Sequence, residues 1–326
     1  MRAVVCSQLG TPDLLSIGEL PDPEPGPGQV TIEVETASFN FPDLLVIAGE
    51  YQFRAEPPFA PGGEAAGTIV AVGPGVTGFA VGDRVAAIGS SGAFASRWSV
   101  DAALTVPIPD GISFATAAAC TMTYGTSYHG LVQRAGIQPG ETLLVLGAAG
   151  GVGSAAIDIG KALGATVIAA ASTEDKRAFC VDLGADHAID YTDGRFREII
   201  ADLTDGQGVD VVYDPVGGSH SEAALRSIAW GGRHLIVGFT AGEIPRIGLN
   251  IPLLKGASLV GVFWGSFAAR EPDTNRSNAR RIFDMVEKGT LTPRIAATLP
   301  FEKFTDGFAM LASRSVMGKA LLSVRG

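Results

Sequence analysis

Hydrophobic and polar positions follow two different patterns along the chain. Up to about residue 117, short alternating or apolar segments are separated by turns rich in glycine and proline. This pattern predicts strands at 30–34, 68–72, 84–88 and 96–100. Residues 21–28 hold four prolines and are predicted to form a rigid loop. The first part of the chain is therefore predicted to be an all-β domain, barrel-like or partly open.

From Glu141 onward, short apolar runs alternate with segments of helical spacing. The apolar runs predict strands at 142–147, 166–170, 186–189, 209–213, 233–237 and 258–263, with helices between most of them. Such alternation predicts a doubly wound parallel sheet. Earlier in the chain, the pattern predicts a helix that starts within 113–120 and can continue through 124–134. Beyond the sheet, the pattern predicts helices at 275–287 and 304–311 and a strand at 319–324. The predicted domains are a nucleotide-binding domain at 118–264 and a catalytic domain made of 1–117 and 265–326.

A glycine-rich turn follows the first predicted strand of that sheet. Four glycines fall within residues 147–153, and a helical pattern runs from 154 to 163. In a strand–turn–helix unit, glycines let the backbone approach a pyrophosphate, and the amides at the helix start bind its charge. The first glycine of the dinucleotide fingerprint is replaced by Ala148, while Gly150 and Gly153 are in place. The predicted cofactor contacts in the turn are Ala149, Gly150, Gly151, Val152 and Gly153.

The end of the second strand indicates which dinucleotide binds. NAD sites usually carry Asp or Glu there, about 20 residues past the start of the fingerprint. Here residues 170–173 carry no carboxylate, and Glu174 and Asp175 follow only at the start of the next helix. The Ser172 hydroxyl and the Lys176 ammonium suit a 2′-phosphate, so we predict NADPH over NADH. A solvated helix residue is the competing interpretation of Lys176.

Composition narrows the class of protein. A chain of 326 residues is long enough for two domains, and a formal charge of −10 without a basic run argues against nucleic acid as a partner. No apolar stretch reaches ~18 residues and the N-terminus has no signal-peptide pattern, so no membrane association is expected. The scattered Cys6, Cys120 and Cys180 suggest a reducing compartment, with the cytoplasm as the default.

Several motifs, taken in order, resemble those of one enzyme family over nearly the whole length. They are ASFNFPD at 37–43, GEY at 49–51, PGGEAAG at 61–67, VGDRV at 81–85, AGGVG at 149–153 and LGAD at 183–186. The chain resembles the medium-chain dehydrogenase/reductases and, among them, the zinc-independent NADPH:quinone oxidoreductases. The resemblance implies an α/β fold in which a Rossmann doubly wound parallel sheet accompanies a partly open, β-barrel-like (GroES-like) catalytic domain.

The chain departs from the metal-dependent branch of that family at two positions. Zinc alcohol dehydrogenases have Cys where this chain has Asn40, and His where it has Gly63. A catalytic zinc needs about three protein ligands of N, S or carboxylate type. The four histidines share no ligand spacing and are expected in ordinary surface or helix-end roles. We therefore predict no metal.

The missing zinc ligands favour a substrate that is already a hydride acceptor. The leading prediction is two-electron reduction of a quinone by NADPH. The alternative in the same fold is an enone or enoyl-thioester reductase, which also needs a proton, with Tyr51 or Tyr124 as candidate acids. From another class, an NADPH-binding redox sensor or a structural protein with little turnover stays open.

The resemblance places Asn40, Asp43 and Tyr51 in the catalytic cleft. Asn40 is implied to donate to a substrate oxygen or to the nicotinamide carboxamide; on turn chemistry alone, a cap before a short helix is equally probable. Asp43 has the simpler interpretation of starting that helix. The Tyr51 hydroxyl is implied to donate to a quinone oxygen, with its ring stacking on a flat acceptor. Glu64 is interpreted as structural rather than catalytic.

The resemblance also implies cofactor contacts outside the glycine turn. Asn40 and Thr126 would contact the nicotinamide, Tyr191 would lie near the adenosine 2′-phosphate, and Lys319 would approach a cofactor phosphate. The loops bordering the nicotinamide ribose would contain Gly238, Phe239, Phe263 and Trp264. A homodimer is expected, with the apolar segment 260–267 at the edge of the sheet.

Overall fold

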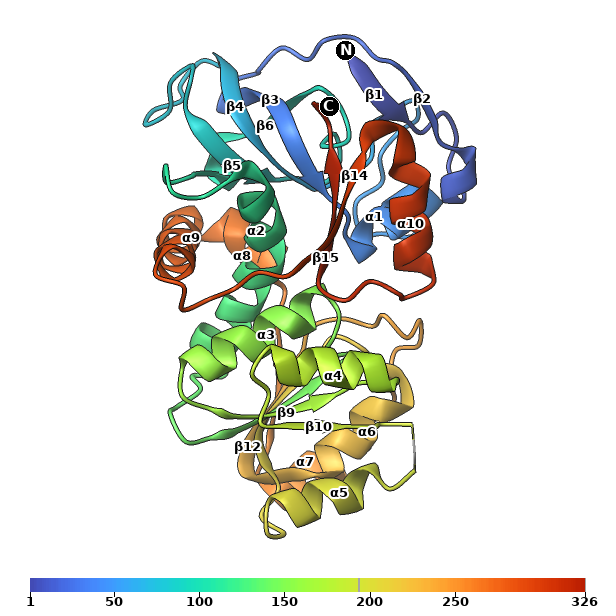
Figure 1. The fold of residues 1–326 in the computed structure, drawn as a ribbon, viewed down its shortest axis with the longest axis vertical. Coiled ribbons are helices and arrows are strands. Elements are labelled where there is room, and N and C mark those ends of the chain that lie inside the picture. Colours follow the sequence, from blue (N-terminus) through green and yellow to red (C-terminus); the bar gives the residue numbers. More distant parts are fainter. Residues whose placement is uncertain (193, 326) are drawn as a thin grey trace. The chain divides into compact units, whose positions relative to one another are not determined.

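The computed structural model describes residues 1–192 and 194–325, which form two compact units. The mixed-sheet unit comprises Met1–Met122, Phe267–Gly289 and Pro293–Gly326, and the parallel-sheet unit comprises Thr123–Ser266 and Thr290–Thr292. Each unit has its own sheet (Figure 1). Within the described part of the chain, no helix has the length and apolar character needed to cross a membrane.

The mixed-sheet unit is built on a seven-stranded sheet in the order β14-β15-β3-β4-β5-β7, with β6 also pairing with β3. All pairs are antiparallel except β14 with β15. Its strands are β3 (Gln29–Ser38), β4 (Glu64–Val72), β5 (Arg84–Ile88), β6 (Arg97–Asp101), β7 (Thr105–Pro107), β14 (Ile295–Pro300) and β15 (Lys319–Ser323). A separate hairpin joins β1 (Arg2–Val5) to β2 (Ser16–Glu19). Four predicted strands of this region are confirmed as β3 to β6.

The core of the mixed-sheet unit lies on one side of β3. Val30, Ile32 and Val34 alternate into it and are fully buried. Phe39 and Phe308 meet edge to face, with ring centroids 5.3 Å apart. The helices of this unit include α1 (Phe41–Ala48), α9 (Pro272–Glu287) and α10 (Phe304–Ala312), and most of α2 (Phe114–Tyr128) belongs to it. The predicted helices at 275–287 and 304–311 are confirmed.

The parallel-sheet unit has six strands, all parallel, in the order β10-β9-β8-β11-β12-β13. The order reverses between β8 and β11, as in the doubly wound fold that the alternation predicts. The strands are β8 (Thr142–Leu146), β9 (Thr166–Ala170), β10 (His187–Ile189), β11 (Val209–Asp214), β12 (Ile228–Ile236) and β13 (Ser258–Gly261).

Helices cover both faces of this sheet. On one face lie α3 (Gly151–Ala162) and α4 (Glu174–Asp182); on the other lie α5 (Phe196–Leu203), α6 (Gly218–Arg226) and α7 (Asn250–Lys255) (Figure 1). Phe196, Leu225 and Ile251 join the strands in one buried cluster, so the apolar runs of the strands are covered as expected for a parallel sheet.

Three boundaries differ from the sequence prediction. The strand predicted at 258–263 ends at Gly261, and α8 (Trp264–Arg270) takes up the second half of the apolar segment 260–267 that was expected at the edge of the sheet. That prediction was wrong, because a short apolar run has no periodicity that separates strand from helix. β12 starts at Ile228, five residues earlier than predicted. α3 starts at Gly151 rather than at 154, since Gly150 serves as its N-cap.

Candidate functional site

The glycine turn between β8 and α3 is shaped by glycines at three of its positions. Gly147 has a φ of +57°, which a side chain rarely adopts. A Cβ on Gly153 would lie 2.4 Å from the Gly147 carbonyl oxygen, so this position has no space for a side chain. Gly150 caps α3, and a Cβ there would meet only the Gly147 oxygen, at 3.4 Å. The turn therefore keeps its backbone open beside the start of a helix, and it fits a pyrophosphate.

The structure explains the alanine in place of the first fingerprint glycine. The positive φ of the turn falls one residue earlier, on Gly147. Ala148 donates its backbone N–H to the Ala170 carbonyl at 3.2 Å, which ties the turn to the end of β9. The departure at 148 thus leaves the phosphate-binding geometry of the turn intact.

The end of β9 carries no carboxylate, as the sequence indicated. Thr173 caps α4 by accepting the backbone N–H of Lys176 at 3.3 Å. Ser172 and the Lys176 side chain are half-buried in this region. Beyond β10, the Tyr191 ring packs edge to face on His220, with centroids 4.6 Å apart. Both rings line an open groove of about 620 Å³ that is bordered by α5 and α6.

A buried polar network at the ends of β11 and β12 was missed by the sequence analysis. Asp214 accepts backbone N–H bonds from Val216 and Gly217 at 2.9 Å, and side-chain bonds from Ser221 and from His234 Nε2. Burial alone would raise the Asp214 pKa, but the bonds from His234 and Ser221 hold it below its usual range. His234 is 1% exposed, so the surface or helix-end role predicted for it was wrong. The network fixes the loop after β11 at the carboxyl edge of the sheet.

The other predicted cofactor residues of this unit fall into two places. Gly238 donates its N–H to the Asp214 carbonyl, and Phe239 packs against Gly217, so this loop lies beside the Asp214 network. Trp264 is buried with its indole against Gly125, next to Thr126 in α2, whereas Phe263 is exposed. The Trp264 indole N–H has no acceptor within the described part of the chain.

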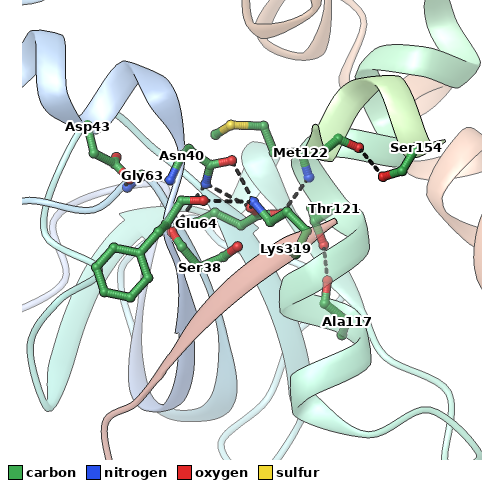
Figure 2. Close-up of polar contacts among 12 residues, drawn as sticks. Ser38, Asn40, Asp43, Gly63, Glu64, Ala117, Thr121, Met122, Ser154 and Lys319 are labelled. Carbon is green, nitrogen blue, oxygen red and sulfur yellow. Dashed lines mark hydrogen bonds and ion pairs between the residues drawn. The ribbon is translucent and has the colours of Figure 1, made fainter. Parts of the chain in front are cut away.

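In the mixed-sheet unit, three side chains distant in sequence form a buried ionic cluster, the Lys319 cluster (Figure 2). Lys319 Nζ donates to Asn40 Oδ1 at 2.7 Å, to the Phe39 carbonyl at 3.1 Å and to Glu64 Oε2 at 3.2 Å. Glu64 is fully buried and also accepts the Met122 backbone N–H through Oε1. Every ammonium proton of Lys319 can therefore be satisfied inside this unit. The phosphate contact expected of Lys319 stays a prediction, and these bonds disfavour it.

The Asn40 amide is oriented by its two charged neighbours. Lys319 only donates and Glu64 only accepts, so the oxygen must face the lysine and the nitrogen the glutamate. Nδ2 donates to Glu64 Oε2 at 2.9 Å and to the Ser38 carbonyl at 3.2 Å. Both amide protons are thus engaged. Asn40 has no N–H left for a substrate, although the second lone pair of Oδ1 can still accept.

Asp43 joins the start of α1 to the turn before β4. Its Oδ2 accepts the Asn40 backbone N–H at 2.8 Å, and its Oδ1 accepts the Gly63 N–H at 3.1 Å. The helix-starting interpretation of Asp43 is therefore correct. Complete burial raises the Asp43 pKa to about 7; nearby Glu64 adds to this, while the hydrogen bonds and Lys319 oppose it.

Tyr51 is the one predicted cleft residue of this unit whose polar atom is not engaged. No hydrogen bond of its hydroxyl is formed within residues 1–192 and 194–325, and its ring packs on the core of the unit. Burial, followed by the charge of Asp43, raises the Tyr51 pKa. The hydroxyl therefore stays protonated and can donate. Tyr124, the other candidate acid, already donates to Asp158 Oδ2 at 2.7 Å.

The position of the missing zinc ligand is closed by the backbone. A Cβ on Gly63 would lie 2.8 Å from the Gly89 carbonyl oxygen, so a histidine there would require the backbone to move. Among the described residues, no three His, Cys, Asp or Glu side chains are grouped as metal ligands.

A six-stranded doubly wound sheet with this glycine turn, joined to a mixed-sheet unit, defines the class of dinucleotide-dependent oxidoreductases. Comparison with known families agrees. Residues 26–110 match the alcohol dehydrogenase GroES-like domain, and residues 151–280 match the zinc-binding dehydrogenase family. The chain belongs to the medium-chain dehydrogenase/reductase superfamily and is one of its quinone oxidoreductase-like members.

Similar proteins cover nearly the whole chain. A quinone oxidoreductase-like protein 2 homolog from Nematostella vectensis is 36% identical, over 99% of this chain and 89% of the relative. A mycobacterial structure complexed with NADPH aligns with a TM-score of 0.93 and 31% identity, over 99% of this chain and 100% of the other. A quinone oxidoreductase from Pseudomonas syringae aligns with a TM-score of 0.91 and 32% identity, over 99% of each chain.

Proposed function

We propose that the protein is an NADPH-dependent reductase that passes a hydride to a quinone and yields the hydroquinone in one two-electron step. The observation that carries the proposal is the β8–α3 turn, where glycines keep the backbone open at a helix start. The similarity of the chain to a quinone oxidoreductase and to a structure that holds NADPH supports the choice of cofactor and acceptor.

In this proposal, the chain's residues bind and orient, and bound NADPH supplies the hydride. The backbone at Ala149, Gly150 and Gly151 and the first amides of α3, at Val152 and Gly153, hold the pyrophosphate. The lack of a carboxylate at the end of β9 removes the partner of a ribose 2′-hydroxyl and admits a 2′-phosphate. Ser172, Lys176 and Tyr191 are proposed to surround that phosphate.

Around the nicotinamide, we propose Thr126, Gly238, Phe239, Phe263 and Trp264 as contacts. The structure supports this indirectly, because Trp264 lies against the helical turn that carries Thr126. Asn40 is proposed to act as an acceptor through Oδ1, since both of its amide protons are already bonded.

For the acceptor, the proposed donor is Tyr51. Reduction of a quinone places negative charge on its oxygen, and a positioned hydroxyl stabilises that charge. Within the described residues the Tyr51 hydroxyl has no hydrogen-bond partner, and its raised pKa keeps it protonated, as this role needs. Asp43 is a positioning residue in this scheme, because both of its carboxylate oxygens accept backbone N–H groups of the protein.

The test is NADPH oxidation with a naphthoquinone and an α,β-unsaturated ketone in parallel. We expect turnover of the quinone, a Tyr51→Phe variant that is slower by one to two orders of magnitude, and no effect of EDTA. Turnover of the enone alone would make the protein a double-bond reductase with Tyr51 as the candidate acid. Loss of activity in EDTA would contradict the metal-free proposal. Tight NADPH binding without turnover of either acceptor would favour a sensor.

We also propose a homodimer formed through the parallel-sheet unit. β13 is an edge strand, and exposed apolar side chains gather on and near it: Trp230, Leu253, Leu254 and Leu259. An uncovered edge of this kind favours pairing with another chain.

The three buried thiols, none in a disulfide, support a reducing compartment such as the cytoplasm.

A further inference from the structure

An arginine that belongs to none of the sequence motifs lies at the ends of β9 and β10. Arg177 Nη1 donates to the Ala171 carbonyl at 3.3 Å and to Asp190 Oδ2 at 2.8 Å. Ala171 directly follows β9, and Asp190 directly follows β10. The guanidinium is therefore held at the carboxyl edge of the parallel sheet, the edge at which ligands bind in open α/β sheets.

The side chain is anchored on one edge and open on the other. Asp190 is itself fixed, because Thr192 donates to its Oδ1 through both N–H and hydroxyl, at 2.8 and 2.6 Å. These bonds, with help from Arg177, hold the Asp190 pKa below its usual range, so the ion pair persists at neutral pH. Arg177 is 26% exposed, and in the described part of the chain Nε and Nη2 have no acceptor. A pre-positioned guanidinium fork is left unoccupied.

We propose that Arg177 is the main determinant of NADPH over NADH, with its Nε–Nη2 edge binding the adenosine 2′-phosphate. The proposal rests on the proposed NADPH dependence and names the residue that produces it. A fork of parallel N–H groups matches two phosphate oxygens, which a single ammonium cannot do. An arginine near the end of the second strand is also the usual way to accommodate this phosphate in a doubly wound fold.

The helix geometry favours Arg177 over its neighbour Lys176. Consecutive residues on an α-helix point about 100° apart, so the two side chains leave α4 in different directions, of which one leads to the ends of β9 and β10. The bonds to Ala171 and Asp190 show that Arg177 takes this direction. Arg177 is paired with Asp190, and α4 carries Glu174 and Asp175 in its first turn.

The test compares two nucleotides that differ only in the 2′-phosphate, 2′,5′-ADP and 5′-AMP, by isothermal titration calorimetry. Arg177→Met is expected to raise the Kd for 2′,5′-ADP by about 10- to 100-fold and to leave the Kd for 5′-AMP within about twofold. Arg177→Lys keeps the charge without the fork and should fall between wild type and Arg177→Met. It also carries the test if Arg177→Met does not fold.

Arg226→Met is the matched control. Arg226 is an ion-paired arginine of the same unit, bonded to Glu222 at the C-terminal end of α6. Its loss should change neither Kd. Lys176→Met completes the set and should change the Kd for 2′,5′-ADP less than Arg177→Met does.

Two results would overturn the assignment while leaving the proposed function standing. One is an equal loss of both nucleotides in Arg177→Met, which would give Arg177 a structural role only. The other is a loss of 2′,5′-ADP affinity in Lys176→Met but not in Arg177→Met. A wild-type protein that binds neither nucleotide would overturn both proposals. If NADPH binding depends on Arg177 but no quinone is turned over, the role of Arg177 is supported. Only the proposal that a quinone is the hydride acceptor is then contradicted.

Discussion

In the parallel-sheet unit, the groups proposed to bind the pyrophosphate are backbone groups within residues 147–153. In the mixed-sheet unit, the Lys319 cluster brings together side chains from the N-cap of α1, from β4 and from β15, which are up to 279 residues apart along the chain. The first site depends on the absence of side chains and the second on the mutual satisfaction of buried charges. Substitutions should therefore affect the two sites in different ways.

The difference follows from what each site costs the fold. Backbone amides at a helix start lack intrahelical partners in any helix, so a site made from them adds no buried charge. Glu64 and Lys319 are 0% and 5% exposed, and buried charges are tolerated only when they are paired and hydrogen-bonded. Substitutions in the glycine turn should therefore change mainly the cofactor affinity, and substitutions in the Lys319 cluster mainly the free energy of unfolding.

The largest expected effect is that of Lys319→Met, because it leaves the Glu64 carboxylate buried without its counter-charge. The free energy of unfolding, from urea denaturation, should fall by about 3–5 kcal/mol. Glu64→Gln combined with Lys319→Met should recover most of that loss. Lys303→Met is the control and should change little, since Lys303 is 63% exposed and its ion pair measures 3.9 Å. A loss below about 1 kcal/mol in Lys319→Met would show that the Glu64 carboxylate does not depend on Lys319 as its counter-charge.

The glycine turn offers a matched pair of smaller effects. Gly153→Ala places a methyl group 2.4 Å from the Gly147 oxygen and should cost about 1–3 kcal/mol of stability together with NADPH affinity. Gly150→Ala meets its nearest atom only at 3.4 Å, so it should weaken NADPH binding with little loss of stability. Urea unfolding and fluorescence titration separate the two outcomes. Wild-type NADPH affinity in Gly150→Ala would contradict the proposed approach of the pyrophosphate.

The raised pKa of Asp43 predicts a pH dependence of stability. Its pKa rises from 3.8 to about 7 on burial, so between these values the folded protein keeps a proton that the unfolded chain releases. The contribution of Asp43 is fully present below the unfolded pKa and is lost as the pH rises through the folded one. Its loss lowers the free energy of unfolding by at most ~1.4 kcal/mol for each unit that the pH rises between these two pKa values.

Asp43→Asn removes this titration and should flatten the slope between about pH 5 and 7. The variant should also be less stable at every pH, since one of its two side-chain acceptors becomes a donor facing an N–H group. The slope from urea unfolding is therefore the diagnostic quantity. Identical slopes in the variant and the wild type would show that Asp43 does not titrate there.

The smallest expected effect on stability and activity is that of Leu259→Lys on β13. A charge on the exposed edge should block strand pairing between copies, while the fold of each unit is kept. Light scattering should then give 33.5 kDa for the variant and twice that value for the wild type. A variant that stays dimeric would move the interface elsewhere.

The strands and the glycine turn were predictable because their signals are local. Residues 142–146 and 166–170 are apolar in sequence and form β8 and β9. The shift of the positive φ to Gly147 was not predictable, because any of the clustered glycines could adopt it. The start of α8 at Trp264 was missed because its apolar segment fits either a strand or a helix.

The chemistry of the side chains was less predictable, because it depends on partners far away in sequence. Asn40 was expected to donate, and only the position of Glu64 and Lys319 shows that its protons are used. Arg177 reads as an ordinary helix residue until Ala171 and Asp190 are seen beside it. The sequence gives no sign of these contacts, since neither spacing nor periodicity records them.

The most direct test of the proposed activity is an anaerobic single turnover with NADPH deuterated at the transferred position of nicotinamide C4. One NADPH should be consumed per naphthoquinone reduced, and the hydroquinone should form without a semiquinone signal. A primary isotope effect is also expected when chemistry is the slow step, with transfer of the deuterium out of the cofactor. A semiquinone that accumulates, or two quinones reduced per NADPH, would contradict hydride transfer as the reaction of this protein.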